Sequence, residues 1–192
     1  ACNIPGELIG TAPEASYLLL RSEDVAAEYP AEEDYWIVAL EFADSLGCDV
    51  ANTSLGYTTF DNPEFDHSYP EFDGESLRIS KAANLAADKG MVMVCSAGNW
   101  GNEPWFYICA PSEAKKVLSV AAVNAEGTVT AFSSRGFNQP GLPPKPDIAA
   151  MGSAVVVVNS NGSFQLSSGT SFSSPLLAGM AACLLALFPD LS

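Results

Sequence analysis

Short apolar runs alternate along the chain with longer segments in which apolar residues recur every three or four positions. The short runs are typical of buried strands, and they lie at residues 16–21, 48–56, 91–98, 117–123 and 146–150. The longer segments are typical of helices, and they lie after Pro30, from about Ser76 to Lys89, and from near Thr170 to just before Pro189. Strands that alternate with helices predict a three-layer α/β domain with a mainly parallel sheet and helices on both faces.

The first predicted helix has one apolar face and a clear end. Trp36, Leu40 and Ala43 fall on that face, and Gly47 is a suitable residue to end the helix. The last predicted helix contains the longest apolar run, Leu176 to Phe188. Its 13 residues are too few to span a bilayer, so we interpret it as a buried helix.

Two further stretches have patterns of their own. The sequence AVVVVNSNGSFQL places an Asn-Gly pair at 161–162 between two apolar runs, which predicts a β-hairpin. Residues 57–75 are rich in acids, aromatic residues and prolines, and they predict a long surface insertion. The chain shows no internal repeat, so we treat residues 1–192 as part of a single domain with this insertion inside it.

The acidic composition limits the partners that we expect. The chain has 23 acidic and 8 basic side chains and a net charge of −15, which disfavours nucleic acid and anionic membranes as partners. Hydrophobic residues make up 48% of the chain, as in a globular domain. The cysteines form no C-x-x-C pair and have no clustered histidine, which argues against a zinc site. Their odd number leaves at least one thiol unpaired within the chain: Cys2, Cys48, Cys95, Cys109 and Cys183.

Ser171 is the first candidate for chemistry. It follows Gly169 and Thr170 at the start of the last predicted helix, where free N–H groups and a partial positive charge favour a developing oxyanion. The same position is also a common helix N-cap. The residue types alone leave both interpretations open.

The sequence around Ser171, GTSFSSPLLAG, closely resembles the nucleophile motif of the subtilisin-like serine proteases, Gly-Thr-Ser-x-x-x-Pro followed by a helix of small residues. The resemblance implies that Ser171 attacks the peptide carbonyl group, and Pro175 fits the motif proline in the first helical turn. SAGNWG resembles the family's Ala-Gly-Asn segment, which implies that Asn99 donates a hydrogen bond to the tetrahedral oxyanion. A neutral amide suits this role because it does not titrate, although an asparagine after Gly98 is also a common turn residue.

A third match is NTSLG, which resembles the family's Ser-Leu-Gly strand. In the family this strand lines the primary specificity pocket and pairs with an extended substrate. GTAPEASYLLLR and FSSRG match further segments in the family's order, so the resemblance spans nearly the whole chain. It implies substrate contacts at Ser54, Leu55, Gly56, Ser96, Ala97, Gly98, Cys109 and Thr170.

The base that takes the proton of the serine is missing from these matches. The family's chain order is Asp, His, Ser, and neither its Asp-Ser/Thr-Gly nor its His-Gly-Thr motif occurs in the 192 residues. The one histidine, His67, lies within residues 57–75 in a context that matches neither motif, and we interpret it as an ordinary loop residue.

We therefore expect the chain to be the C-terminal part of a subtilase catalytic domain, beginning after the histidine motif. The parent protein is then expected to be a serine endopeptidase, secreted or held in the cell envelope as the family implies. The fragment alone is expected to be inactive. A non-catalytic pseudoprotease that binds peptides is the alternative, and the residues upstream of Ala1 distinguish the two.

In the family, the strand that carries the aspartate lies between the strands that match residues 16–21 and 49–53. Its absence predicts an open sheet edge, and hence a homodimer or a strand swap through that edge. No cofactor is expected to be required. Asp147 resembles a position that contributes to a weak cation site in some members, which makes a structural calcium ion an expectation there. Cys95 and Cys109 are expected near the pocket, and a disulfide or two independent thiols both remain open.

Two other α/β classes fit the residues less well. An α/β-hydrolase needs Gly-x-Ser-x-Gly around its nucleophile, whereas GTSFS ends in Ser173. A nucleotide-binding domain needs a glycine-rich phosphate loop, which the chain lacks.

Overall fold

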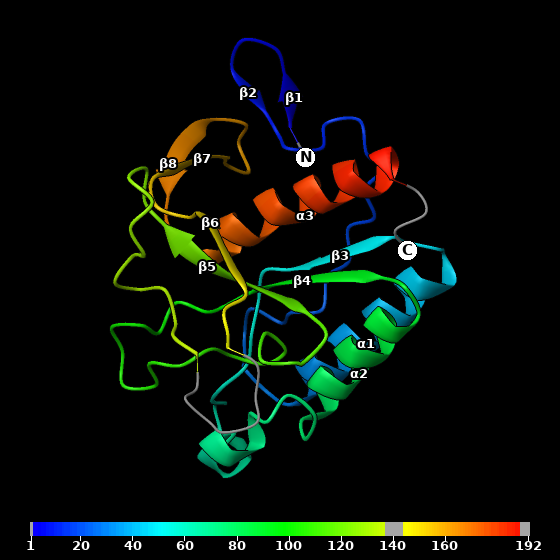
Figure 1. Ribbon diagram of the computed structural model, residues 1–192. Helices are drawn as coiled ribbons and strands as arrows, with labels where there is room; N and C mark the ends of the chain where they lie inside the picture. Colours follow the sequence, from blue (N-terminus) through cyan, green and yellow to red (C-terminus); the bar gives the residue numbers. More distant parts are fainter. Residues whose placement is uncertain (1, 137–143, 189–192) are drawn as a thin grey trace.

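Four parallel strands form the main sheet in the order β3-β4-β5-β6 (Figure 1). The computed structural model describes residues 2–136 and 144–188. The strands of the main sheet are β3 (Val50–Thr53), β4 (Val92–Ser96), β5 (Leu118–Val123) and β6 (Ile148–Met151). Two antiparallel pairs lie outside it, β1 (Asn3–Ile4) with β2 (Leu8–Ile9) and β7 (Val155–Val158) with β8 (Phe164–Ser167).

Three helices cover the two faces of the sheet. Helices α1 (Ala31–Ser45) and α2 (Arg78–Asp88) lie together on one face, and α3 (Thr170–Leu187) crosses the other face in contact with all four strands (Figure 1). This arrangement confirms the predicted three-layer α/β fold. Among the described residues, α3 is the one helix long and apolar enough to cross a membrane. It contacts every strand of the sheet and buries Leu177 and Ala178. The prediction of a buried helix is wrong for its second half, since Leu184 and Leu187 are 44% and 71% exposed.

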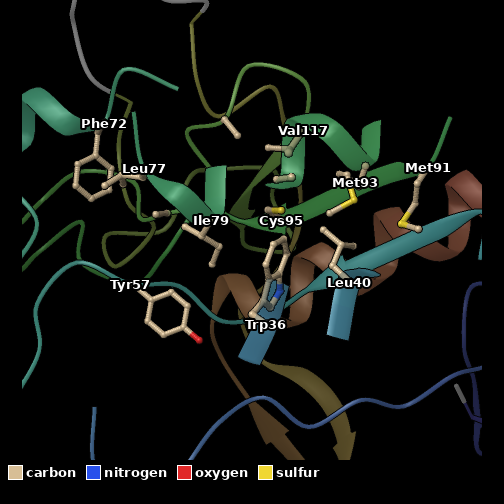
Figure 2. Packing of buried hydrophobic residues seen from close by; sticks show 14 of the residues in the cluster. Trp36, Leu40, Tyr57, Phe72, Leu77, Ile79, Met91, Met93, Cys95 and Val117 are labelled. Atoms are coloured by element: carbon tan, nitrogen blue, oxygen red, sulfur yellow. The ribbon is translucent and has the colours of Figure 1, made fainter. Parts of the chain in front are cut away.

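Strand β4 connects the two halves of the core because its successive side chains point to opposite faces of the sheet. Met93 and Cys95 point into the cluster under α1 and α2, where Trp36 and other apolar side chains surround them (Figure 2). Val94 points the other way and packs with Leu177 of α3. Burial on both faces explains why this segment reads as a continuous apolar run.

The predicted helices and the hairpin are all present. Helix α1 buries Trp36, Leu40 and Ala43 as expected, and Gly47 follows its end with a φ of +75°, a conformation that glycine adopts without steric cost. Strands β7 and β8 form the predicted hairpin. The strands are shorter than the apolar runs that predict them, since residues 48–56 contribute only β3.

Residues 16–21 form no strand, and this prediction was wrong. Leu18, Leu19 and Leu20 are exposed, Leu19 to 87%. Within the described residues, β3 is an edge strand that pairs only with β4, and residues 16–21 do not pair with its open edge. Apolar composition alone does not make a strand, because strand formation depends on cross-strand partners.

Residues 57–75 are only partly a surface insertion. Their acidic side chains are exposed or half-buried, as predicted. Tyr57, Phe60 and Phe72 are buried in the core cluster under α1 and α2, which the prediction missed. Two short 3-10 turns lie between them, η1 (Pro63–Phe65) and η2 (Tyr69–Glu71).

Candidate active site

Ser171 lies in the first turn of α3, beside the carboxyl end of β3. Its hydroxyl Oγ donates to the backbone oxygen of Ser54 at 3.2 Å, and the Ser54 hydroxyl donates to the backbone oxygen of Ser171 at 3.0 Å. Ser171 is half-buried. The pair of hydrogen bonds fixes the start of α3 against the segment that follows β3, although the two residues are 117 positions apart.

Asn99 is held by Thr170, the residue that precedes Ser171. The side-chain oxygen Oδ1 of Asn99 accepts from the backbone N–H of Thr170 at 2.8 Å and from its hydroxyl at 3.0 Å. The backbone N–H of Gly98 lies 3.1 Å from the same hydroxyl. Since Oδ1 is engaged and no described residue accepts a hydrogen bond from Nδ2, the amide N–H₂ of Asn99 is free to donate to a developing oxyanion.

The remaining predicted substrate contacts lie in two backbone segments that continue β3 and β4. The last paired residues of the two strands are Thr53 and Cys95. Beyond them, residues 54–56 are half-buried and residues 96–98 are buried. Cys109 joins this region through its backbone N–H, which donates to the oxygen of Ala97 at 3.2 Å. The predicted residues therefore lie in one neighbourhood.

All five cysteines are free thiols, which settles the alternative for Cys95 and Cys109. Cys95 points into the core under α1 and α2 (Figure 2), and burial raises the pKa of its thiol to about 12. Burial also raises the pKa of the Cys109 thiol. Both groups are neutral at physiological pH and unsuited to nucleophilic chemistry.

His67 lies outside the candidate site. Its Nε2 atom is 2.8 Å from Oε1 of Glu33 in α1, and its ring packs edge-on against Phe60 and Phe72. Burial lowers the pKa of the imidazole, but the hydrogen bond and charge of Glu33 outweigh burial and raise the pKa above its usual value. These contacts explain His67 as a structural residue.

Asp147 is satisfied by groups of the chain itself. Its Oδ2 atom accepts from the backbone N–H of Ser119 and from Nζ of Lys145, both at 2.7 Å. The Lys145 ammonium also donates to the backbone oxygen of Val117 at 2.6 Å. The charge that a metal ion would supply at Asp147 is thus supplied by a buried lysine.

A denser group of carboxylates lies before and within α1. Oxygens of Glu23, Glu28 and Glu32 lie within 4.8 Å of one another. Burial, followed by the charge of Glu32, raises the pKa of Glu28. The Glu32 carboxylate accepts from the backbone N–H groups of Asp24 and Tyr29, so it already has hydrogen-bond partners.

Two polar links near the site were missed by sequence reasoning. The Ser174 hydroxyl donates to Oδ1 of Asn52 at 2.6 Å, which ties the second turn of α3 to β3. Glu113 is a buried carboxyl whose Oε1 accepts from the Ser80 hydroxyl, while its Oε2 has no partner among the described residues. Burial raises the pKa of Glu113 to about 7, although the Ser80 hydrogen bond opposes the shift. The position of Asn52, a polar residue inside a predicted apolar strand, was the sequence feature that could have indicated the first link. No sequence feature indicated that Glu113 is buried.

A serine hydroxyl at a helix N-terminus, a free amide donor beside it, and the carboxyl ends of parallel strands together are typical of serine hydrolases. The family model described as the subtilase family matches residues 3–192, and the chain belongs to that family, whose members are serine proteases.

Curated relatives agree with this assignment. A thermophilic serine proteinase of Bacillus sp. (strain AK1) is 30% identical over 146 residues, which are 76% of this chain and 30% of that protein. Subtilisin E of Bacillus subtilis (strain 168) is 27% identical, over 95% of this chain and 42% of the relative. Thermitase of Thermoactinomyces vulgaris is 29% identical, over 92% and 54%. The chain spans only about a third to a half of the length of these relatives.

Solved structures share the fold. The patellamide maturation protease PatA superposes with a TM-score of 0.75 at 24% identity, over 97% of this chain and 61% of that one. The prenylagaramide maturation protease PagA gives a TM-score of 0.64 at 27% identity, over 82% and 50%. The described residues therefore have the subtilisin-like fold over most of their length.

Proposed function

We propose that this chain is the nucleophile-bearing part of a subtilisin-like serine endopeptidase. The proposal rests chiefly on one observation: the backbone N–H and hydroxyl of Thr170 hold the side-chain oxygen of Asn99, and Ser171 is the next residue of α3. The family assignment supports the reaction class, and the order of the three matched motifs supports the roles of the residues.

In the proposed reaction, a base takes the proton of the Ser171 hydroxyl while Oγ forms a bond to the carbonyl carbon of a peptide. The carbonyl oxygen becomes an oxyanion, and Nδ2 of Asn99 and the N–H groups at the start of α3 stabilise it. The C–N bond then breaks, the amine leaves with the proton, and water releases the acyl group from Ser171. Backbone groups of residues 54–56 and 96–98 hold the extended substrate, as the family resemblance implies.

The base and the acid that orients it are not among the 192 residues in this scheme. The described contacts assign His67 to Glu33, and the sequence contains neither of the family's two other triad motifs. We propose that upstream residues of the parent protein supply both groups and that the 192 residues alone do not hydrolyse peptides. In subtilisin, loss of the histidine costs about 10⁶ in turnover, nearly as much as loss of the whole triad.

Peptide hydrolysis by two chains tests this proposal. One is the 192-residue chain and the other is the parent chain with its upstream residues. We expect turnover only in the second, lost on Ser171→Ala and reduced about 10²–10³-fold on Asn99→Ala, as for the equivalent donor in subtilisin. Ser171-dependent turnover by the 192 residues alone contradicts the division of the triad. A parent chain that binds peptides without cleaving them favours the pseudoprotease.

We further propose that peptides are the substrates, that no metal ion or cofactor is needed, and that the parent protein is exported, as the family suggests. The strong negative charge supports the absence of nucleic acid partners. If no metal ion is needed, the activity of the parent protein should survive chelation by EDTA. Recovery of the parent protein in the cytoplasmic fraction of its cells would contradict export.

The open edge of β3 supports self-association of the isolated chain. β3 pairs only with β4 among the described residues, and unpaired strand edges are templates for pairing with another copy. We expect light scattering to give twice the monomer mass of 20.1 kDa, and Leu19→Lys, in the exposed apolar segment, to shift the protein toward monomer. A monomer at high concentration contradicts the proposal.

A further inference from the structure

Pro175 interrupts the hydrogen bonding of α3 at the residue proposed as the nucleophile. It lies inside the helix, beyond the first turn in which the family resemblance places it, and four residues after Ser171. In a regular α-helix the backbone oxygen of Ser171 would accept from the N–H of residue 175. Proline has no N–H, and its ring crowds the oxygen four residues earlier. The carbonyl group of Ser171 therefore lacks its usual helical donor.

The Ser54 hydroxyl replaces that donor. It donates to the backbone oxygen of Ser171 at 3.0 Å, and the Ser171 hydroxyl donates to the backbone oxygen of Ser54 at 3.2 Å. One residue thus holds both the carbonyl group and the hydroxyl group of Ser171. The Ser171 hydroxyl must leave its bond when a base takes its proton, whereas the bond to the carbonyl group can persist throughout the reaction.

Asn52 sets the direction of this bond. Its Nδ2 atom donates to Oγ of Ser54 at 2.9 Å, and its Oδ1 atom accepts from the Ser174 hydroxyl at 2.6 Å. A hydroxyl group has only one hydrogen to donate. Because Oγ of Ser54 accepts from Asn52, its own hydrogen is left for Ser171. An acceptor in place of Nδ2 would compete for that hydrogen.

We propose that Ser54 is a positioning residue for the nucleophile, and that Asn52, held by Ser174, orients it. This relay replaces the helical bond that Pro175 cannot make, and it fixes the backbone from which the Ser171 hydroxyl projects. The inference rests on the proposed function, since the position matters only if Ser171 attacks a peptide. The proposed peptide contacts in this region are made by backbone groups, so loss of the relay should lower kcat and leave KM nearly unchanged.

Peptide hydrolysis by the parent chain measures this role. Ser54→Ala removes the donor, and Asn52→Asp keeps the size of the side chain but replaces the Nδ2 donor with an acceptor. We expect either change to lower kcat about 10- to 100-fold with KM within about twofold of wild type, because a misplacement of about 1 Å costs up to about 10²-fold. Ser54→Thr, which keeps the hydroxyl, should recover most of the kcat lost in Ser54→Ala.

Asn159→Asp is the matched control. Nδ2 of Asn159 donates to Oγ of Ser163 at 3.1 Å in the exposed turn between β7 and β8. The substitution therefore removes the same kind of donor and adds the same charge outside the relay, and it should leave kcat and KM unchanged. A loss of kcat equal to that of Asn52→Asp would contradict the relay. A thermal melt of each variant establishes that it is folded.

The contact itself is measured in the 192-residue chain without catalysis. The ¹³C chemical shift of the Ser171 carbonyl reports its hydrogen bond, and we expect it to move upfield in Ser54→Ala and in Asn52→Asp but not in Asn159→Asp. An unchanged shift in a folded Ser54→Ala chain contradicts the inference whatever the activity.

The kinetic outcomes separate the inference from the proposed function. Hydrolysis that depends on Ser171, with kcat unchanged in either Ser54→Ala or Asn52→Asp, contradicts the relay and leaves the proposed function intact. A parent chain that does not hydrolyse peptides contradicts the proposed function, and the positioning role falls with it.

Discussion

The two faces of α1 differ sharply in how much of their apolar surface is covered. On the face toward the sheet, Trp36 and Leu40 are only 6% and 7% exposed. On the outer face, Tyr35, Val38 and Phe42 are 56%, 63% and 49% exposed. A surface helix normally carries polar residues on its outer face, so α1 is apolar on both sides but buried on only one.

The outer face of α1 lines an apolar hollow of about 390 Å³ together with Leu20 and Arg21, next to the segment that failed to form a strand. The candidate site lies instead between β3, β4 and α3, where Ser171 and Ser54 exchange hydrogen bonds and Val94 packs with Leu177. Ser171 and Asn99 are thus held by hydrogen bonds to other described residues, whereas the outer face of α1 and residues 16–21 are apolar surface without cover.

The largest expected effect tests this contrast directly within α1. Leu40→Ala should lower the free energy of unfolding by about 2–5 kcal/mol, because it leaves a cavity in the core. Val38→Ala should lower it by less than about 0.5 kcal/mol, since the side chain is mostly in water. Urea unfolding of the two variants measures both values. Equal losses would mean that the outer face is covered in solution.

Glu113 carries a carboxyl group that is buried inside the protein. Burial raises its pKa to about 7, and the hydrogen bond from the Ser80 hydroxyl partly offsets this rise. The nearby charged groups that act on Glu113 are His67 and Glu33, which pair with each other. A carboxyl with a raised folded-state pKa is protonated in the folded state while already ionised in the unfolded state. Stability from this group is therefore highest below about pH 4.5 and falls as pH rises toward and beyond 7.

Glu113→Gln removes this ionisation while keeping a hydrogen-bond acceptor for Ser80. We expect wild type to lose on the order of 2–3 kcal/mol of stability relative to the variant between pH 5 and pH 8. His67, whose pKa is also raised, loses its contribution in the same direction, but it is common to both chains and cancels. Parallel pH profiles of wild type and variant would show that water reaches Glu113 and that the region is not closed.

A smaller effect distinguishes a buried lysine from an exposed one. Lys145→Met should cost about 1–3 kcal/mol, because the buried ammonium loses its bonds to Val117 and Asp147 and leaves the Asp147 charge without its partner. Lys89→Met, which breaks an exposed pair with Asp44, should cost less than about 1 kcal/mol. Thermal unfolding at low and high salt measures both, and only the Lys89 effect should decrease strongly with salt. Equal costs would contradict the buried position of Lys145.

The periodicity of apolar residues was enough to predict the three helices, the parallel sheet and the hairpin, because each of these elements packs or pairs with another part of the chain. Residues 16–21 have the same pattern without a partner strand, and there the prediction failed. The aromatic residues of 57–75 were placed at the surface because their neighbours are acidic, yet Tyr57 and Phe72 complete the core.

The candidate site was predictable to a different extent. Ser171, Asn99 and residues 54–56 were identified by motif resemblance, and the structure brings them together. The role of Thr170 in orienting Asn99, the link from Ser174 to Asn52 and the buried Glu113 were not predictable, since they depend on contacts between residues tens of positions apart. Sequence patterns report local periodicity, whereas these contacts arise from tertiary packing.

The central claim is that Ser171 is a nucleophile that becomes reactive only when a base is supplied from outside these 192 residues. The most direct test is the rate at which a fluorophosphonate probe labels Ser171, with the modified residue located by mass spectrometry, in the 192-residue chain and in the parent chain with its upstream residues. We predict rapid labelling of Ser171 in the parent chain, at least about 10³-fold faster than in the 192 residues, and none after Ser171→Ala. Labelling at equal rates in the two chains, or labelling of a residue other than Ser171, would contradict the account.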